Sequence, residues 1–241
     1  MAKTGAADLA ALKRAIRGIE QGGYGVCEAT PISLDGNAID AALPWGGLAR
    51  AGLHEIACGE ATGFGFHAGL LRRAAGETGL VLWCRHAGME RETGLPYGPG
   101  LSAFGLAATQ FVFVRARKPA DILWAMEEGL QAGSLAAVVG DGISPDFTAT
   151  RRLQLAAEIS STPSFLLPPA ATGSKTAPLS AALTRWRVQA LPSVRDGLHM
   201  RWRVELKRCR GGAPKQWTVE WDEQTFCFRL AEILADRAAA G

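Results

Sequence analysis

Strand-like and helix-like segments alternate along the middle of this chain, and the alternation limits the folds that it can adopt. Between residues 53 and 167, short apolar runs of strand length are separated by segments with helical spacing. The predicted strands are 53–57, 80–84, 110–115, 135–140 and 164–167, and the predicted helices are 66–76, 101–104, 119–132 and 150–160. The runs FVFV and LAAVV are apolar at consecutive positions, which is typical of parallel strands covered on both faces. We therefore expect an α/β fold with a mostly parallel central sheet flanked by helices.

The two ends of the chain differ from this middle part. Residues 168–178, PPAATGSKTAP, predict a loop, and four later segments alternate apolar and polar residues as antiparallel strands do: 184–190, 200–208, 216–221 and 225–230. Residues 8–21 predict an amphipathic helix with Leu9, Leu12, Ile16 and Ile19 on one face. The expected organisation is an N-terminal helix and docking segment (1–36), the α/β core (37–168), a flexible loop (169–183), and an antiparallel extension with a C-terminal tail (184–241).

Composition excludes several classes of protein. No apolar run in the 241 residues approaches the ~18 needed to span a bilayer, and the first 25 residues lack the apolar core of a secretory signal. We expect a soluble, cytoplasmic protein. The five cysteines are scattered and never spaced C-x-x-C, which argues against a disulfide framework or a zinc site. The four histidines are isolated in sequence, so no metal or catalytic role is assigned to them: His54, His67, His86 and His199.

A segment near residue 60 has the outline of a phosphate-binding loop. After the strand that begins at Leu53, the sequence CGEATGFG supplies Cys58, Gly59, Gly63, Phe64 and Gly65. A working loop needs a lysine for the outer phosphates and a Ser or Thr hydroxyl for Mg²⁺, but Phe64 and Gly65 stand at those two positions. An ordinary strand-to-helix turn would explain the glycines equally well. The spacing therefore predicts either a degenerate phosphate loop or a simple turn.

Positive charge gathers in the C-terminal part. Nine Lys or Arg residues lie between residues 185 and 215, against two acids, although the whole chain has a net charge of only +3. The candidates for contact with DNA or an acidic partner are Arg185, Arg187, Arg201, Arg203, Lys207, Arg208 and Arg210. Solvated strand faces are the alternative interpretation of the same residues.

Tryptophans are interleaved with these basic residues. Because strand side chains alternate between faces, we expect the arginines on one side and four tryptophans in the core: Trp186, Trp202, Trp217 and Trp221. Single-strand binders need charge and stacking rings on the same face, so only the arginines remain candidates for contact. In the helix at 119–132, the spacing of Trp124, Met126 and Leu130 predicts core packing.

The order of elements and the stretch LPWGGLARAGLHEIACGEATG resemble the core of the RecA recombinase family. That resemblance places Arg85, after the strand 80–84, at the position of the family's catalytic Glu. It also places the Mg²⁺-linked acid near Gly140, with Asp141 one residue late. With Phe64 for the lysine and Gly65 for the hydroxyl, the resemblance implies a pseudo-ATPase without a cofactor.

Longer segments resemble the ImuA family more closely. They are PYGPGLSAFGL, VRARKPADILWAMEEGLQAGSLAAVVG, TRRLQLAAE, TRWRV and RWRVELKRCRGGAPKQWTVEWDEQTFCFRL. The resemblance implies an accessory protein of damage-induced (SOS) mutagenesis and translesion DNA synthesis. Its implied partners are an ImuB-type Y-family polymerase homologue and RecA, with an error-prone DnaE-type polymerase and single-stranded DNA as further candidates. Leu9, Leu12, Ile16 and Ile19 are the candidate residues for partner binding.

Two other functions remain open from the sequence. A RecA-fold regulator such as the cell-division inhibitor SulA also lacks a phosphate loop, and its target would be the tubulin-like division protein. A divergent, DNA-binding RecA-like ATPase with an unconventional loop is the third possibility, and nucleotide titration would distinguish it.

Overall fold

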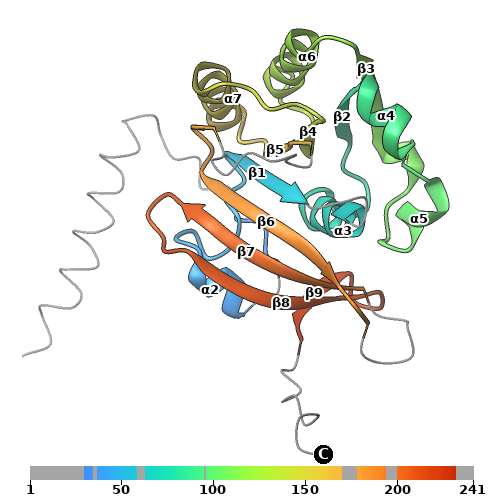
Figure 1. The fold of residues 1–241 in the computed structure, drawn as a ribbon, viewed down its shortest axis with the longest axis vertical. Coiled ribbons are helices and arrows are strands. Elements are labelled where there is room, and N and C mark those ends of the chain that lie inside the picture. Colours follow the sequence, from blue (N-terminus) through green and yellow to red (C-terminus); the bar gives the residue numbers. More distant parts are fainter. Residues whose placement is uncertain are drawn as a thin grey trace, which may run out of the picture.

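The chain forms an α/β structure built on one nine-stranded sheet (Figure 1). The computed structural model describes residues 30–34, 37–58, 63–94, 96–169, 178–193 and 200–231. Along the sheet the strands follow the order β3-β2-β4-β5-β1-β6-β7-β8-β9. Their bounds are β1 Leu53–Cys58, β2 Val81–His86, β3 Phe111–Ala116, β4 Ala137–Asp141, β5 Ser164–Leu167, β6 Thr184–Leu191, β7 Arg201–Cys209, β8 Lys215–Asp222 and β9 Cys227–Leu230.

The helices connect the parallel strands. They are α2 Ala38–Ala42, α3 Phe64–Ala75, α4 Ala87–Thr93, α5 Gly98–Ser102, the 3₁₀ turn η2 Ala108–Gln110, α6 Pro119–Gln131 and α7 Phe147–Ser160. Pro119 at the start of α6 and the Asp146 side chain, which accepts the Ala149 N–H at the start of α7, are ordinary helix-initiating features. The sequence did not predict α4, and α3 begins two residues earlier than expected.

The predicted mixture of parallel and antiparallel strands is confirmed, with one correction. Strands β1 to β5 pair in parallel, and β7, β8 and β9 extend the sheet by antiparallel pairing. Strand β6 was expected to be wholly antiparallel, but it pairs in parallel with β1 and antiparallel only with β7. It therefore joins the two parts of the sheet, and the C-terminal strands continue the core sheet.

Two apolar layers cover opposite faces of the parallel strands. Helices α6 and α7 pack side by side on one face, as Figure 1 shows, with Ile122, Met126 and Leu153 completely buried there. The other face carries α3 and receives the aromatic residues of β7 to β9. The contact with α3 is close: a Cβ added at Gly69 would lie 2.9 Å from both the Phe228 and the Trp221 rings.

The four C-terminal tryptophans are buried in this second layer, as predicted: Trp186, Trp202, Trp217 and Trp221. Met126 and Leu130 are also buried, but the prediction for Trp124 is wrong, because this side chain is 65% exposed. Residues two positions apart on a helix are separated by about 200° around its axis, so Trp124 and Met126 point to opposite sides of α6.

Within the described ranges, no helix has both the length and the apolar character of a membrane span.

Candidate functional site: the carboxyl edge of the parallel strands

The segment that resembles a phosphate loop joins β1 to α3. Cys58 is the last residue of β1, Gly63 precedes α3, and residues 59–62, including Gly59, lie outside the described ranges. Counting back from Gly63, the first glycine of the G-x-x-x-x-G-K-[ST] pattern falls on Cys58. Phe64 and Gly65 take the lysine and hydroxyl positions and are the first two residues of α3.

Phe64 packs on the sheet where a lysine would be needed. Its ring stacks on the indole of Trp83 in β2, with ring centroids 6.1 Å apart and planes inclined by 29°. Trp83 is itself buried and also contacts the rings of Phe111 and Phe113. The position that would carry a phosphate-binding ammonium thus belongs to an aromatic cluster.

The neighbouring position has no room for a side chain. A Cβ at Gly65 would lie 2.9 Å from the Trp202 ring, 3.1 Å from the Phe104 ring and 3.2 Å from the Met200 sulfur. These distances are shorter than ordinary van der Waals contacts, so a serine or threonine could enter only if those side chains moved. The residues that fill this space come from α5–η2 and from the C-terminal strands.

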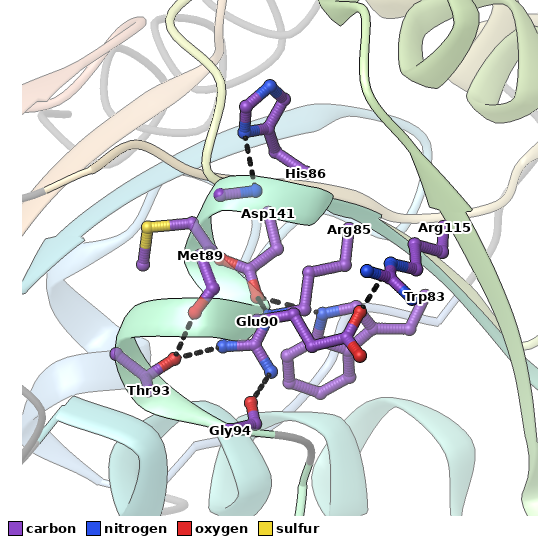
Figure 2. A network of polar contacts seen from close by, with 10 residues as sticks. Trp83, Arg85, His86, Met89, Glu90, Thr93, Gly94, Arg115 and Asp141 are labelled. Atoms are coloured by element: carbon purple, nitrogen blue, oxygen red, sulfur yellow. Dashed lines mark hydrogen bonds and ion pairs between the residues drawn. The ribbon is translucent and has the colours of Figure 1, made fainter.

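Arg85 lies inside β2, because the strand continues to His86 and does not end at Cys84 as predicted. In the parallel register Arg85 is directly opposite Asp141, the last residue of β4. Its Nε is 3.0 Å from Oδ2 of Asp141, and its Nη1 donates to the Gly94 carbonyl at 2.7 Å. Figure 2 shows the same guanidinium donating through Nη2 to the Thr93 hydroxyl at the end of α4.

Asp141 is held by a second donor. The indole N–H of Trp83 donates to its Oδ2 at 3.1 Å. Both members of the ion pair are nearly buried, with Asp141 6% and Arg85 9% exposed. Burial raises the pKa of Asp141 above its ordinary value, while the charge of Arg85 and the indole hydrogen bond act in the opposite direction. Arg85 and Trp83 therefore stabilise the negative charge of the buried Asp141 carboxylate.

A second ion pair closes the outer side of this network. Glu90 of α4 lies 2.8 Å from Nε of Arg115, which is opposite Arg85 on β3 (Figure 2). The Thr93 hydroxyl also donates to the Met89 carbonyl at 2.9 Å. Helix α4 is thus attached to the carboxyl edge of the sheet by Glu90 and Thr93. Its sequence, AGMERET, has too few apolar residues to be predicted as a helix.

The described residues contain no group of three or more His, Cys, Asp or Glu side chains placed to hold a metal ion. Asp141, which follows the predicted position of the Mg²⁺-linked acid by one residue, has two partners on its Oδ2 within the chain.

Comparisons with known proteins identify the family. No protein-family model matches the chain. Over 233 aligned residues it is 34% identical to Protein ImuA of Caulobacter vibrioides strain NA1000 / CB15N, covering 88% of this chain and 93% of that protein. Protein ImuA of Caulobacter vibrioides strain CB 15 gives the same values. This chain belongs to the ImuA family. The family predicted from the two WRV blocks and RCRGG is thereby confirmed.

In this ImuA-family chain most of the predicted basic contact residues already have partners. Ion pairs or carbonyl contacts hold five of the seven: Arg185 with Glu55 (2.6 Å), Arg201 with Glu220 (2.8 Å), Lys207 with Glu205 (3.2 Å), Arg208 with the Ser180 carbonyl (2.7 Å) and Arg210 with Glu158 (3.8 Å). Arg187 and Arg203 are exposed, and no ion pair involves them within the described ranges. Glu205 lies opposite Arg187 across the β6–β7 pair. The face therefore alternates in sign, and its contact with DNA or an acidic partner stays a prediction.

The predicted partner-binding residues Leu9, Leu12, Ile16 and Ile19 lie outside the described part of the chain.

Sequence reasoning missed one pair of potentially reactive side chains in this ImuA homologue. The Cys58 sulfur lies 3.1 Å from Nε2 of His67, one turn into α3. Burial raises the pKa of the thiol to about 12 and lowers the pKa of His67 to about 4. Both groups are therefore neutral near pH 7, and the pair lacks the thiolate and imidazolium of a reactive cysteine site. The two residues are nine positions apart and form no recognised sequence motif, so the sequence did not indicate their contact.

We predict that Asp141→Asn destabilises the fold by roughly 3–5 kcal/mol, because it leaves the Arg85 charge buried without a countercharge. Urea unfolding would measure the loss. The double variant Arg85→Met/Asp141→Asn removes both charges and keeps an acceptor for the Trp83 N–H, so it should recover most of the stability. A small effect of Asp141→Asn, or a double variant no better than the single one, would contradict the buried pair.

Acid should destabilise the protein through its buried histidines. His54 is completely buried between the Thr184 hydroxyl and the Ala49 carbonyl, each 2.7 Å from a ring nitrogen, and burial lowers its pKa to about 4, as for His67. The unfolded chain binds protons as pH falls below about 6.5, while the folded chain resists until about pH 4. Stability is therefore retained above pH 6.5 and lost below it, by up to roughly 3 kcal/mol per histidine. Unfolding free energies measured from pH 7 to pH 5 should fall more steeply for the native chain than for His67→Gln; equal slopes would contradict the assignment.

Proposed function

We propose that this chain is a non-catalytic, RecA-like accessory protein of damage-induced mutagenesis that acts through protein partners in the ImuA/ImuB system. The observation that carries the proposal is the occupied carboxyl edge of the sheet, where Phe64, Gly65 and Arg85 replace the three groups needed for nucleotide chemistry. Family membership supports the pathway, because the Caulobacter relative is named Protein ImuA.

The chemistry of the substitutions argues against turnover. An arginine cannot accept a proton, so Arg85 cannot activate a water molecule as a glutamate would. Its guanidinium already contacts Asp141, Gly94 and Thr93. Without the ammonium and the hydroxyl, neither the phosphates nor their Mg²⁺ would be stabilised.

The fold also leaves surfaces on which partners could dock. Among the strands that the structure describes, β3 is at the edge of the sheet and pairs with β2 alone. It exposes Val112 and Phe113, and its free backbone groups could accept an added strand from a partner. ImuB and RecA are the partners we propose, with the predicted helix at 8–21 contributing to RecA binding.

We predict no saturable binding of Mg²⁺-ATP at millimolar concentration, measured by calorimetry with the full chain. The variant Phe64→Lys/Gly65→Thr restores the two missing groups, but the threonine collides with Trp202 and Phe104. It should gain no ATP affinity and lose roughly 1–3 kcal/mol of stability. Binding or hydrolysis by the native chain would overturn the proposal of a non-catalytic protein.

The partner proposal has its own test. Deleting residues 1–22 should weaken co-purification with RecA while leaving the core folded, because the predicted apolar face at Leu12 and Ile16 is removed. Leu12→Glu/Ile16→Glu should act like the deletion, and Ala11→Glu, on the opposite side of the predicted helix, should not. Unchanged recovery of RecA after the deletion would contradict docking through this segment.

A further inference from the structure

The outward face of β6, β7 and β8 is polar throughout its middle. The inward face of these strands belongs to the aromatic layer, while α6 and α7 pack on β1 to β5 at the other end of the sheet (Figure 1). Neither of these helices therefore covers the outward face of β7 and β8. From Arg185 to Gln189 in β6, from Arg201 to Arg208 in β7 and from Gln216 to Glu220 in β8, every side chain that points outward is polar.

Two cations on this face have no countercharge in the described structure. The other cations have partners on neighbouring strands or loops: Arg185 with Glu55, Arg201 with Glu220, Lys207 with Glu205 and Arg208 with the Ser180 carbonyl. Arg187 and Arg203 are exposed, and no ion pair involves them within the described ranges. Glu205 lies opposite Arg187 across the β6–β7 pair, but its Oε2 is already 3.2 Å from the Lys207 ammonium.

Arg203 lies in a row of hydrogen-bond donors that crosses three strands. Gln189 of β6 is directly opposite it on one side, and Thr218 of β8 is directly opposite it on the other. No carboxylate lies in this row, and none of its three side chains has a partner among the described residues. Neighbouring strands are about 4.8 Å apart, so the row spans roughly 10 Å. Arg187 is the diagonal neighbour of Arg203, about 7–8 Å away between the Cα atoms.

We infer that the donor row Gln189–Arg203–Thr218, together with Arg187, binds the sugar–phosphate backbone of single-stranded nucleic acid. Guanidinium, amide and hydroxyl groups are side-chain donors that proteins use for phosphate oxygens, and arginine can hold a phosphate through two hydrogen bonds. The tryptophans of the same strands are buried on the opposite face and cannot stack on bases. Binding would therefore depend on the backbone and not on the base sequence.

The chemistry of the face favours nucleic acid over an acidic protein. Protein interfaces have an apolar core, whereas interfaces with nucleic acid are more polar and more positively charged. The middle of this face has polar side chains at every outward position of the three strands. A single strand fits better than a duplex, because a flat sheet face cannot enter a groove, while a flexible strand can bring successive phosphates to the donors.

This contact goes beyond the proposed function. Docking of protein partners does not require nucleic acid on β6 to β8, and nucleic-acid binding does not require that the chain lacks nucleotide chemistry. Either inference can fail without the other.

Fluorescence anisotropy of a labelled oligo-dT strand with the full chain at low ionic strength tests the contact. Arg187→Gln/Arg203→Gln should weaken binding about tenfold or more, because two charge-assisted hydrogen-bonding groups are lost. It should also reduce the slope of log affinity against log salt concentration by about 1.4, since each single-strand phosphate contact contributes about 0.7. Gln189→Ala/Thr218→Ala should weaken binding without changing the slope, because both side chains are neutral.

The matched control is Arg117→Gln/Lys118→Gln. It removes the same charge from two exposed positions that follow β3, at the far end of the sheet from β7, and should leave both the affinity and the slope unchanged. An unchanged urea unfolding midpoint would show that each variant remains folded.

Four results would overturn the inference. The native chain could fail to bind oligo-dT at low salt. The control could lose as much affinity as Arg187→Gln/Arg203→Gln, which would indicate general charge attraction. An oligo-dT/oligo-dA duplex could bind as tightly as the single strand. Polyglutamate could bind through Arg187 and Arg203 while oligo-dT does not, which would assign the face to an acidic protein.

Discussion

The packing of α3 between the parallel strands and the C-terminal strands is the constraint on which the rest of the structure depends. Its first two turns carry Gly65 and Gly69, and each glycine faces an aromatic ring from β7, β8 or β9 within about 3 Å of where a Cβ would be. The same contacts bury the tryptophans and attach the extension to the core. A serine or threonine at the position of Gly65 would collide with these rings, so the close packing leaves no room there for a side-chain hydroxyl.

The Arg85–Asp141 pair lies at the carboxyl edge of the parallel strands. The carboxyl edge of parallel strands is where ligands of such folds usually bind, since loops diverge there and side chains meet from several strands. Here Arg85, Asp141, Trp83 and Thr93 contact one another at that edge. A buried ion pair contributes little net stability compared with apolar packing, but breaking it is costly. The network therefore stabilises one arrangement of β2, β4 and α4 more than it raises the overall stability.

The sequence predicted the parts of this structure that depend on local pattern. Consecutive apolar residues marked the parallel strands, and alternation placed the tryptophans and arginines on opposite faces. Alternation carries no strand direction, however, so the parallel pairing of β6 with β1 could not be predicted. The Arg85–Asp141 contact joins residues 56 positions apart in the sequence and depends on the register of β2 and β4. Trp124 was wrongly expected in the core, because it lies on the opposite side of α6 from Met126. Helix α4 is short and polar, and its contacts with Arg85 and Arg115 hold it in place.

The fold leaves several large apolar side chains exposed at its surface. In catalytic relatives of such a fold, a bound nucleotide can switch an interface by ordering loops at the carboxyl edge. In the function that we propose, Phe64 and Arg85 leave this chain without that source of free energy, and partner contacts would depend on exposed apolar surface. Val112 and Phe113 of β3, with Trp124 of α6 and Ile159 of α7, supply such a surface.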